Sequence, residues 1–559
     1  MRTCCRLAGL LVIAAGVGAG AQSKPPAAPA PFRSFAPVTE AMLEHPDPAD
    51  WIHWRRTPDN WGYSPLTQVT TQNVMQLQAV WSHKLDQVIV QPGPLVHAGI
   101  MYVPQPPGVV RALDAVTGTM IWEYRKTFET SPSYTWSPRT RTIAMYADNV
   151  YVATPDAHIV ALNARTGEVV WDHTVADYRL GYRYTSGPIA VKGKIVAGMT
   201  GCERYKNDVC FISAHDARTG RELWRLSTIA RPGEPGGDTW GTLPLNRRAG
   251  GDVWIPGSYD PRANLMYWST AQAKPWARVA RGTDGDALYT NSVLAIDPDT
   301  GKLAWYYQFL PGETLDHDEV FENVLVDRNG RTSLFKMGKL GILWEVDRKT
   351  GKFVAAHDLG FQNIVEVNPQ TGTVFYRPDM IPKLNATLTF CPGMGGIKNW
   401  QSSAYYPETQ TLYIPIRPNC ETAEFTAVNP NNIGDFHFYG NPEYSGAKHL
   451  GVTAHPAMPN ERGMLVAMDI NSGRLLWRQA RAAAASSAVL TTAGGLVVAG
   501  FADGTLVIND AKTGQTLFET RTPGAPVTGF PISYAVGGKQ YIAYAVGGNE
   551  AAMKVLALP

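Results

Sequence analysis

Short stretches in which apolar and polar residues alternate recur along the chain, and most of them run into the same turn sequence. Residues 112–122 read ALDAVTGTMIW and residues 161–171 read ALNARTGEVVW. Asp or Asn followed by Thr-Gly supplies a tight turn, and the flanking β-branched and apolar residues favour strands. Further copies surround Asp347 and end at Trp224, Trp305, Trp477 and Phe518.

This repeat predicts a β-propeller. The copies follow one another at intervals of about 40 to 55 residues, except where loops intervene, and long helical patterns are scarce. Such a period is typical of four-stranded blades arranged radially, which protects most sheet edges. We therefore expect an all-β protein, a single eight-bladed propeller over residues 49–559, in which the repeated Trp packs between neighbouring blades.

Length and charge agree with this fold and narrow the function. A chain of 559 residues is too long for one ordinary core but suits an architecture that grows by repetition. The formal charge is +2, and no basic run occurs, so neither nucleic acid nor an anionic membrane surface is an expected partner. A small molecule is the expected ligand.

The first 21 residues have the pattern of a secretory signal peptide. Arg2 and Arg6 precede the apolar run Leu7–Val17, and Ala19–Ala21 offers a cleavage site. Residues 22–48 follow as a Pro/Ala-rich spacer and N-terminal extension. The apolar run is shorter than the about 20 residues of a membrane helix, and no later segment approaches that length. We therefore expect a periplasmic protein without a membrane span.

Cysteine usage fits an oxidising compartment. Two of the six cysteines fall within the signal peptide, and the remaining four suit two disulfides. No C-x-x-C-H motif occurs, so no covalently attached c-type haem is expected. The four candidates are Cys202, Cys210, Cys391 and Cys420.

The A-x-D-x-x-T-G-x-x-x-W unit resembles the tryptophan-docking motif of the dehydrogenases that use pyrroloquinoline quinone (PQQ) to oxidise alcohols, and the resemblance runs from about Trp51 to the C-terminus. It implies a periplasmic enzyme that oxidises an alcohol to an aldehyde or ketone by hydride transfer to metal-bound PQQ. Electrons would then pass to a separate soluble cytochrome c or a similar carrier. The sequence leaves open whether the chain forms a homodimer.

The resemblance also implies a metal and a catalytic base. Glu203, in MTGCE, matches a metal-binding Glu, and Asp316 matches the catalytic base and a further ligand. Asp318 matches an additional carboxylate of lanthanide-dependent members, so the ion is Ca²⁺ or a lanthanide(III) ion. Gln272 stands where the family has an Asn ligand, and its longer side chain is the main departure at the metal.

PQQ is flat and carries three carboxylates, so its site needs an aromatic floor, cations and polar contacts. The resemblance assigns Trp254 as the floor, Arg141 to a cofactor carboxylate and Lys339 to the quinone oxygens, where it would also support catalysis. The remaining expected contacts are Gln91, Thr185, Thr200 and Asn399.

Several positions depart from the family. Thr135 and Trp136 replace its adjacent-cysteine disulfide, and Trp136 would cap the cofactor ring instead. Val498 replaces a Trp and Gln91 a Glu of methanol dehydrogenases, which favours a substrate larger than methanol. Cys391 and Cys420 have the spacing of a family disulfide, and a Cys202–Cys210 bridge would hold the loop beside Glu203.

Two other functions stay open. Within the family, the substrate could instead be a sugar, a polyol or a bulky secondary alcohol, such as a sorbose-like or mycotoxin-like compound. From another class, periplasmic propeller scaffolds share similar docking repeats. The combined acidic, cationic and aromatic set argues against such a scaffold, since a scaffold has no use for it.

Overall fold

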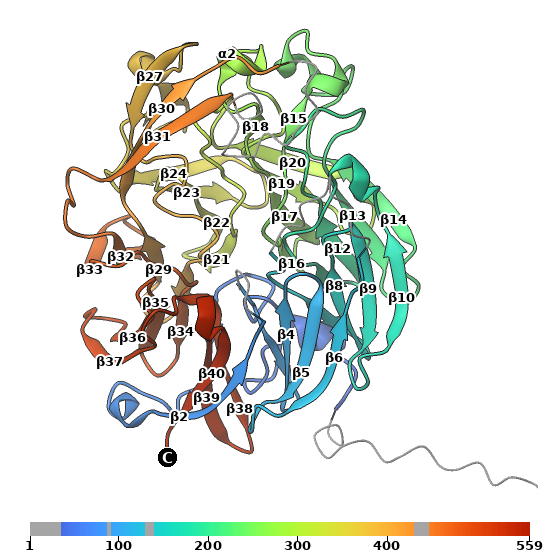
Figure 1. The fold of residues 1–559 in the computed structure, drawn as a ribbon, viewed down its shortest axis with the longest axis vertical. Helices are drawn as coiled ribbons and strands as arrows, with labels where there is room; N and C mark the ends of the chain where they lie inside the picture. The colour runs from blue at the N-terminus through green and yellow to red at the C-terminus, as the bar shows by residue number, and fades with distance from the viewer. Residues whose placement is uncertain (1–34, 87–90, 129–138, 430–445) are drawn as a thin grey trace, which may run out of the picture.

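A computed structural model of the chain describes residues 35–86, 91–128, 139–429 and 446–559. Within them, seven four-stranded sheets and one five-stranded sheet surround a central axis, and together they form an eight-bladed β-propeller (Figure 1). The predicted fold is confirmed. In the four-stranded blades the strands run antiparallel from the innermost strand outward, and in the five-stranded blade a short parallel strand is added at the inner edge.

The first four blades, each from its inner to its outer strand, are β3 (Leu95–His97), β4 (Ile100–Gln105), β5 (Val109–Asp114) and β6 (Met120–Arg125); β7 (Ala144–Tyr146), β8 (Asn149–Ala153), β9 (His158–Asn163) and β10 (Val169–Thr174); β11 (Ile189–Val191), β12 (Lys194–Gly198), β13 (Phe211–Asp216) and β14 (Glu222–Ser227); and β16 (Ser258–Asp260), β17 (Leu265–Ser269), β19 (Ser292–Ile296) and β20 (Leu303–Gln308).

The other four are β21 (Val324–Arg328), β22 (Arg331–Met337), β23 (Ile342–Asp347) and β24 (Phe353–Asp358); β28 (Ala404–Tyr406), β29 (Thr411–Ile416), β32 (Gly463–Asp469) and β33 (Leu475–Arg481); β34 (Leu490–Thr492), β35 (Leu496–Gly500), β36 (Thr505–Asp510) and β37 (Thr516–Arg521), with β1 (Tyr63–Ser64) parallel to β34; and β38 (Val527–Val536), β39 (Lys539–Val546), β40 (Ala552–Ala557) and β2 (Gln78–Lys84).

Smaller elements lie outside the blades. They are the pairs β15 (Ala249–Gly250) with β18 (Ala273–Lys274) and β25 (Val365–Val367) with β26 (Val374–Tyr376), the sheet of β27 (Ala386–Phe390), β30 (Asn419–Phe425) and β31 (Ala447–Ala454), and the helices α1 (Glu40–Glu44) and α2 (Arg278–Arg281). None of the helices in the described ranges is long and apolar enough to cross a membrane.

The two ends of the chain close the ring. β2, near the N-terminus, pairs with β40 near the C-terminus and forms the outer strand of that blade, so blue and red strands lie side by side in Figure 1. Residues 1–34, with the expected signal peptide, lie outside the described residues. The part of the extension that is described packs on the propeller through buried Phe35, Val38 and Leu43.

The repeat sequence joins each blade to the next. A Cβ atom on Gly118 would lie 2.6 Å from the Trp81 ring of the preceding blade, and Gly118 has a φ of +72°, so both the space and the backbone require glycine. Trp81 Nε1 also donates a hydrogen bond to the Ala115 carbonyl over 3.2 Å. The same arrangement joins Trp122 to Gly167 and Trp477 to Gly514. The repeated Trp therefore packs between blades, as predicted.

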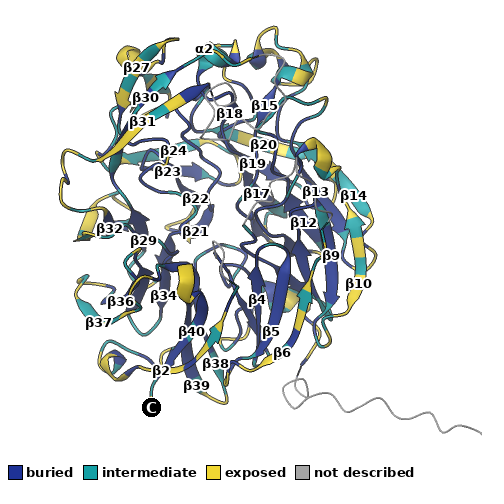
Figure 2. Ribbon diagram, viewed as in Figure 1, coloured by how far each residue is buried: buried dark blue, intermediate teal, exposed yellow. Residues whose placement is uncertain are grey.

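Burial increases toward the axis, as Figure 2 shows. All six residues of β4 are buried, whereas the outer strand β10 alternates between exposed and half-buried positions. The segment before β1 crosses the axis, because fully buried Arg55 donates hydrogen bonds to the carbonyls of Ser403 and Val489 over 2.6 and 2.7 Å. The inner strands are thus held by the chain itself at the centre.

Candidate active site

The predicted site residues come from two kinds of loop. Some precede the innermost strand of a blade, and the others follow its second strand. Because neighbouring strands run antiparallel, the start of the first strand and the end of the second lie at the same end of a blade. Loops from different blades therefore deliver these side chains to one end of the propeller axis.

A cavity of about 310 Å³ lies at this end, which is within the size range of small-molecule sites. It brings together all the predicted cofactor-binding residues and most of the predicted ligands. The lining residues are Gln91, Arg139, Arg141, Arg183, Thr185, Thr200, Glu203, Asp252, Trp254, Lys274, Asp316, Asp318, Lys339, Gly395, Asn399, Trp400 and Arg417.

One side of the cavity is a group of charged side chains, here called the pocket cluster: Glu203, Asp316, Asp318, Lys274 and Lys339. Lys339 Nζ lies 3.3 Å from an Asp316 carboxylate oxygen and 2.7 Å from one of Asp318. Burial opposes the charged form of Lys339, but the two carboxylates outweigh it and raise its pKa. This lysine therefore stays an ammonium beside the predicted base.

The backbone fixes Asp316 in an uncommon conformation. Its φ is +66°, in the left-handed region that a non-glycine residue adopts at an energetic cost. Lys339 Nζ also donates to the Asp316 carbonyl over 2.6 Å, which holds this conformation in place. Such strain concentrates at functional sites, so the position of Asp316 agrees with a role in chemistry.

Gln272 lies beside the cluster although it does not line the cavity. Its amide nitrogen donates to an Asp316 carboxylate oxygen, and its backbone N–H donates to Asp318 over 3.1 Å. Its buried Oε1 has no hydrogen-bond partner among the described residues. The Gln272 side chain thus reaches Asp316, one of the predicted ligands.

Asp252 adds a carboxylate that was not predicted. It accepts a hydrogen bond from the Cys202 N–H over 3.1 Å, while its other carboxylate oxygen, Oδ2, is buried and has no hydrogen-bond partner among the described residues. Burial, and then the neighbouring Glu203 carboxylate, raise the pKa of Asp252 to about 7. Asp252 Oδ2 and Gln272 Oε1 are therefore two buried oxygens without hydrogen-bond partners among the described residues. Together with the carboxylates of the pocket cluster they fit a hard cation, which takes oxygen ligands.

Another part of the cavity lining is cationic and aromatic. The Arg141 guanidinium lies 5.4 Å from the centre of the Trp254 ring and donates to Gln91 Oε1 and to the Thr185 carbonyl, each over 2.9 Å. Burial, and then the neighbouring Arg139, lower the pKa of Arg141 well below its usual range. A buried cation without a carboxylate partner favours an anionic ligand, and a flat ring beside it suits a planar one.

The cavity also contains residues that the sequence analysis missed, and four of them share one signal. Arg139, Arg183, Asp252 and Lys274 each lie two residues from a predicted site residue, in extended backbone where alternate side chains face the same way. Arg417 and Trp400 do not have this two-residue spacing from a predicted site residue. Arg417 follows β29, and Trp400 directly follows Asn399.

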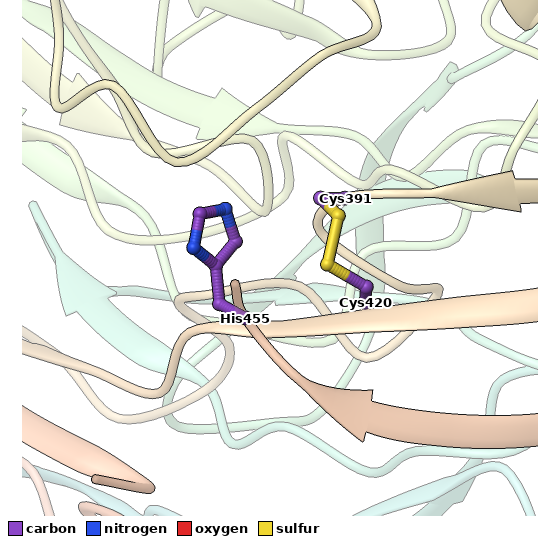
Figure 3. A group of neighbouring side chains, drawn as sticks. All are labelled: Cys391, Cys420 and His455. Atoms are coloured by element: carbon purple, nitrogen blue, oxygen red, sulfur yellow. A yellow bond between two sulfur atoms is a disulfide. The ribbon is translucent and has the colours of Figure 1, made fainter. Parts of the chain in front are cut away.

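Both expected disulfides are present, Cys202–Cys210 and Cys391–Cys420. The first closes the loop that carries Glu203. The second joins the end of β27 to β30, and Figure 3 shows the His455 ring near it. The sulfurs of Cys391 and Cys420 are bonded to each other, so they offer no thiolate to a metal ion. The group of Cys391, Cys420 and His455 is therefore structural rather than a metal site.

One expected pocket feature lies away from the cavity among the described residues, and another falls outside those residues. Val498 lies fully buried within β35, so the proposed effect of this position on the substrate has no support from contact. Thr135 and Trp136 lie outside the described residues. A larger cavity of about 660 Å³ lies on the outer side of the Cys202–Cys210 loop, but none of the predicted site residues lines it.

Comparison with known proteins identifies the family. Residues 51–357 and 368–542 match the PQQ family described as glucose/ethanol/alcohol dehydrogenase, β-propeller domain. The chain belongs to the PQQ-dependent alcohol dehydrogenases. The predicted family is therefore confirmed.

Relatives of this PQQ-dependent dehydrogenase agree over most of its length. It is 31% identical to quinohemoprotein alcohol dehydrogenase ADH-IIG of Pseudomonas putida, over 90% of this chain and 73% of that protein. It is 30% identical to quinoprotein alcohol dehydrogenase PedH of Pseudomonas putida, over 87% of this chain and 84% of that protein. A europium-containing methanol dehydrogenase superposes with a TM-score of 0.80 at 25% identity, covering 93% of this chain and 100% of that one.

Proposed function

We propose that this dehydrogenase oxidises an alcohol to an aldehyde or ketone in the periplasm, using PQQ and a hard cation held in the cavity described above. One observation carries the proposal: acidic side chains line the same cavity as Arg141 and Trp254. A dehydrogenase that must hold a metal, a planar anion and an alcohol needs both groups of residues.

The residues fit these groups. The carboxylates of Glu203, Asp316 and Asp318, with the Gln272 amide oxygen, would hold the cation, which is Ca²⁺ or a lanthanide(III) ion. Arg141 and Trp254 would hold PQQ, with further contacts from Thr185, Thr200, Asn399 and Gln91. When bound, PQQ accepts a hydride from the substrate carbon and the cation polarises it for that reaction.

Asp316 is the general base. Its carboxylate faces the cavity and would accept the proton of the substrate hydroxyl. Lys339 positions it by contacts to both its carbonyl and its carboxylate, and its ammonium supplies positive charge on the same side of the cavity. The buried walls exclude water, which strengthens each of these electrostatic interactions.

The proposal is tested by reconstitution of the purified apo-protein. PQQ binding is followed by absorbance, and dye reduction is followed with primary alcohols, secondary alcohols, polyols and sugars, under Ca²⁺ or La³⁺. We expect dye reduction that requires PQQ, a cation and an alcohol together, and reduction of a soluble cytochrome c in place of the dye. Absence of PQQ binding under either ion would overturn the proposal and favour a non-catalytic scaffold.

A further inference from the structure

Lys274 adds a second lysine ammonium to the cavity, besides that of Lys339, and the sequence analysis did not predict it. Its Nζ lies 3.5 Å from a Glu203 carboxylate oxygen and 3.6 Å from one of Asp316. The side chain is only 2% exposed. The ammonium therefore bridges two of the carboxylates that would hold the cation under the proposed function.

The fold leaves this side chain little freedom. Lys274 belongs to β18, whose backbone pairs with Ala249 of β15, and its ammonium lies 4.9 Å from the centre of the Trp276 ring. A strand pairing at the backbone and a ring beside the ammonium hold the charge where it is. Turning outward to water would separate the ammonium from this ring and from both carboxylates.

The surrounding charges nearly cancel without a metal ion. Glu203 also pairs with Arg183, whose guanidinium lies 3.3 Å away. Asp316 lies between the Lys274 and Lys339 ammonium groups, and Asp318 contacts Lys339. The three predicted carboxylate ligands thus face two lysines and one arginine, so an incoming ion meets positive charge at close range.

We propose that Lys274 is a built-in cation that weakens metal-ion binding in the cavity, and weakens it more for a trivalent ion than for a divalent one. The inference rests on the proposed function. The repulsion between the ammonium and the ion grows in proportion to the charge of the ion. Lys274 therefore offsets the additional carboxylate of Asp318 and shifts the preference of the site from lanthanides toward Ca²⁺.

The test measures ion affinity directly, in the full-length mature protein without PQQ. Tb³⁺ binding is followed by its luminescence on excitation of tryptophan, and Ca²⁺ binding by calorimetry. In Lys274→Met, which keeps length and removes charge, we expect affinity to rise by about tenfold for Ca²⁺ and about thirtyfold for Tb³⁺. Lys274→Arg, which retains the charge, should change both affinities far less.

Two controls make the outcome decisive. Lys349→Met removes the charge of an exposed lysine in a distant turn and should leave both affinities unchanged. Lys274→Gln repeats the test with a polar side chain if Lys274→Met does not fold, as judged by thermal unfolding. Unchanged or lower ion affinity in the neutral variants, or an equal gain for both ions, would overturn the inference.

Failure of the proposed function would look different. It would appear as absence of PQQ binding and of alcohol-dependent dye reduction by the wild-type protein, whatever the ion. The ion affinities of the Lys274 variants do not depend on PQQ, so they test the role of Lys274 in either case.

Discussion

Two groups of lysine and carboxylate side chains lie close together near the propeller axis, and they differ in whether they reach a cavity. The pocket cluster lines the cavity, whereas Glu319, Glu322, Lys336 and Lys398, here called the inner cluster, are buried and do not line it. Asp318 and Glu319 are consecutive in sequence, yet they belong to different clusters.

The two clusters also differ in how burial affects their charges. In the inner cluster, burial raises the pKa of Glu319 to about 8 and lowers the pKa of Lys336 to about 7, so both charged forms are disfavoured. In the pocket cluster, neighbouring carboxylates raise the pKa of Lys339 despite its burial. Burial thus disfavours the charged forms of Glu319 and Lys336, whereas Lys339 keeps its charge beside two carboxylates. Within the inner cluster only the Glu322–Lys398 pair resembles the pocket cluster, since burial raises the pKa of Glu322 but the Lys398 ammonium outweighs it and lowers that pKa.

The largest expected effect separates the clusters by activity. Asp316→Asn keeps the size of the side chain but cannot accept a proton, so we expect kcat for alcohol-dependent dye reduction to fall by about a thousandfold. PQQ binding, measured by absorbance, should persist because Arg141 and Trp254 are unchanged. Steady-state kinetics of the reconstituted variant gives kcat.

The matched control lies in the inner cluster. Glu319→Gln makes the same chemical change as Asp316→Asn, from a buried carboxyl group to an amide, at a position three residues away. We expect kcat of the folded, PQQ-loaded protein to stay close to the wild-type value. If Asp316→Asn retains more than about a tenth of the wild-type kcat, a contribution too small for general-base catalysis, Asp316 is not the base.

The second prediction concerns the contribution of the inner cluster to the free energy of unfolding. Lys398 Nζ lies 2.9 Å from Glu322, and both side chains are almost fully buried. Glu322→Gln leaves the Lys398 ammonium without its counter-charge, so we expect the free energy of unfolding to fall by about 3–5 kcal/mol. Urea denaturation monitored by tryptophan fluorescence measures the loss.

Removing both charges provides the internal control. Glu322→Gln with Lys398→Met removes the Lys398 ammonium as well, so part of the lost stability should return. The rest stays lost, because Glu322 also offsets the buried Arg55 guanidinium. A double variant no more stable than the single one would show that the hydrogen bond from the Ser403 N–H to Glu322, rather than the ion pair, accounts for the loss.

The sequence predicts these regions to different extents. The blades follow from the repeat, because the Thr-Gly turn and the Trp that packs on its glycine are local features that recur in most copies. The pocket residues lie in loops that do not share a pattern, and only the family resemblance brought Glu203 and Asp316 together. Lys274 was missed because a lone lysine beside a proline has no motif, although it stands two residues from the predicted ligand Gln272.

The smallest expected effect concerns the pH dependence of the inner cluster. Lys336 donates to Ser269 and to the Phe321 carbonyl, and burial lowers its pKa to about 7 although Glu319 and Glu322 oppose this shift. An unfolded lysine has a pKa of about 10.4, so between about pH 7 and pH 10 the unfolded chain binds more protons than the folded one. The contribution of Lys336 to the free energy of unfolding therefore rises with pH over this range.

Lys336→Met removes this dependence. Its two lost hydrogen bonds lower stability by an amount that does not change with pH, so the wild-type advantage should grow by about 3 kcal/mol between pH 7 and pH 9.5. Urea denaturation of both proteins at a series of pH values measures it, and Lys302→Met, which alters an exposed lysine, should give a curve parallel to wild type. Parallel curves for Lys336→Met would mean that Lys336 stays charged, and that the two clusters do not differ in the way proposed.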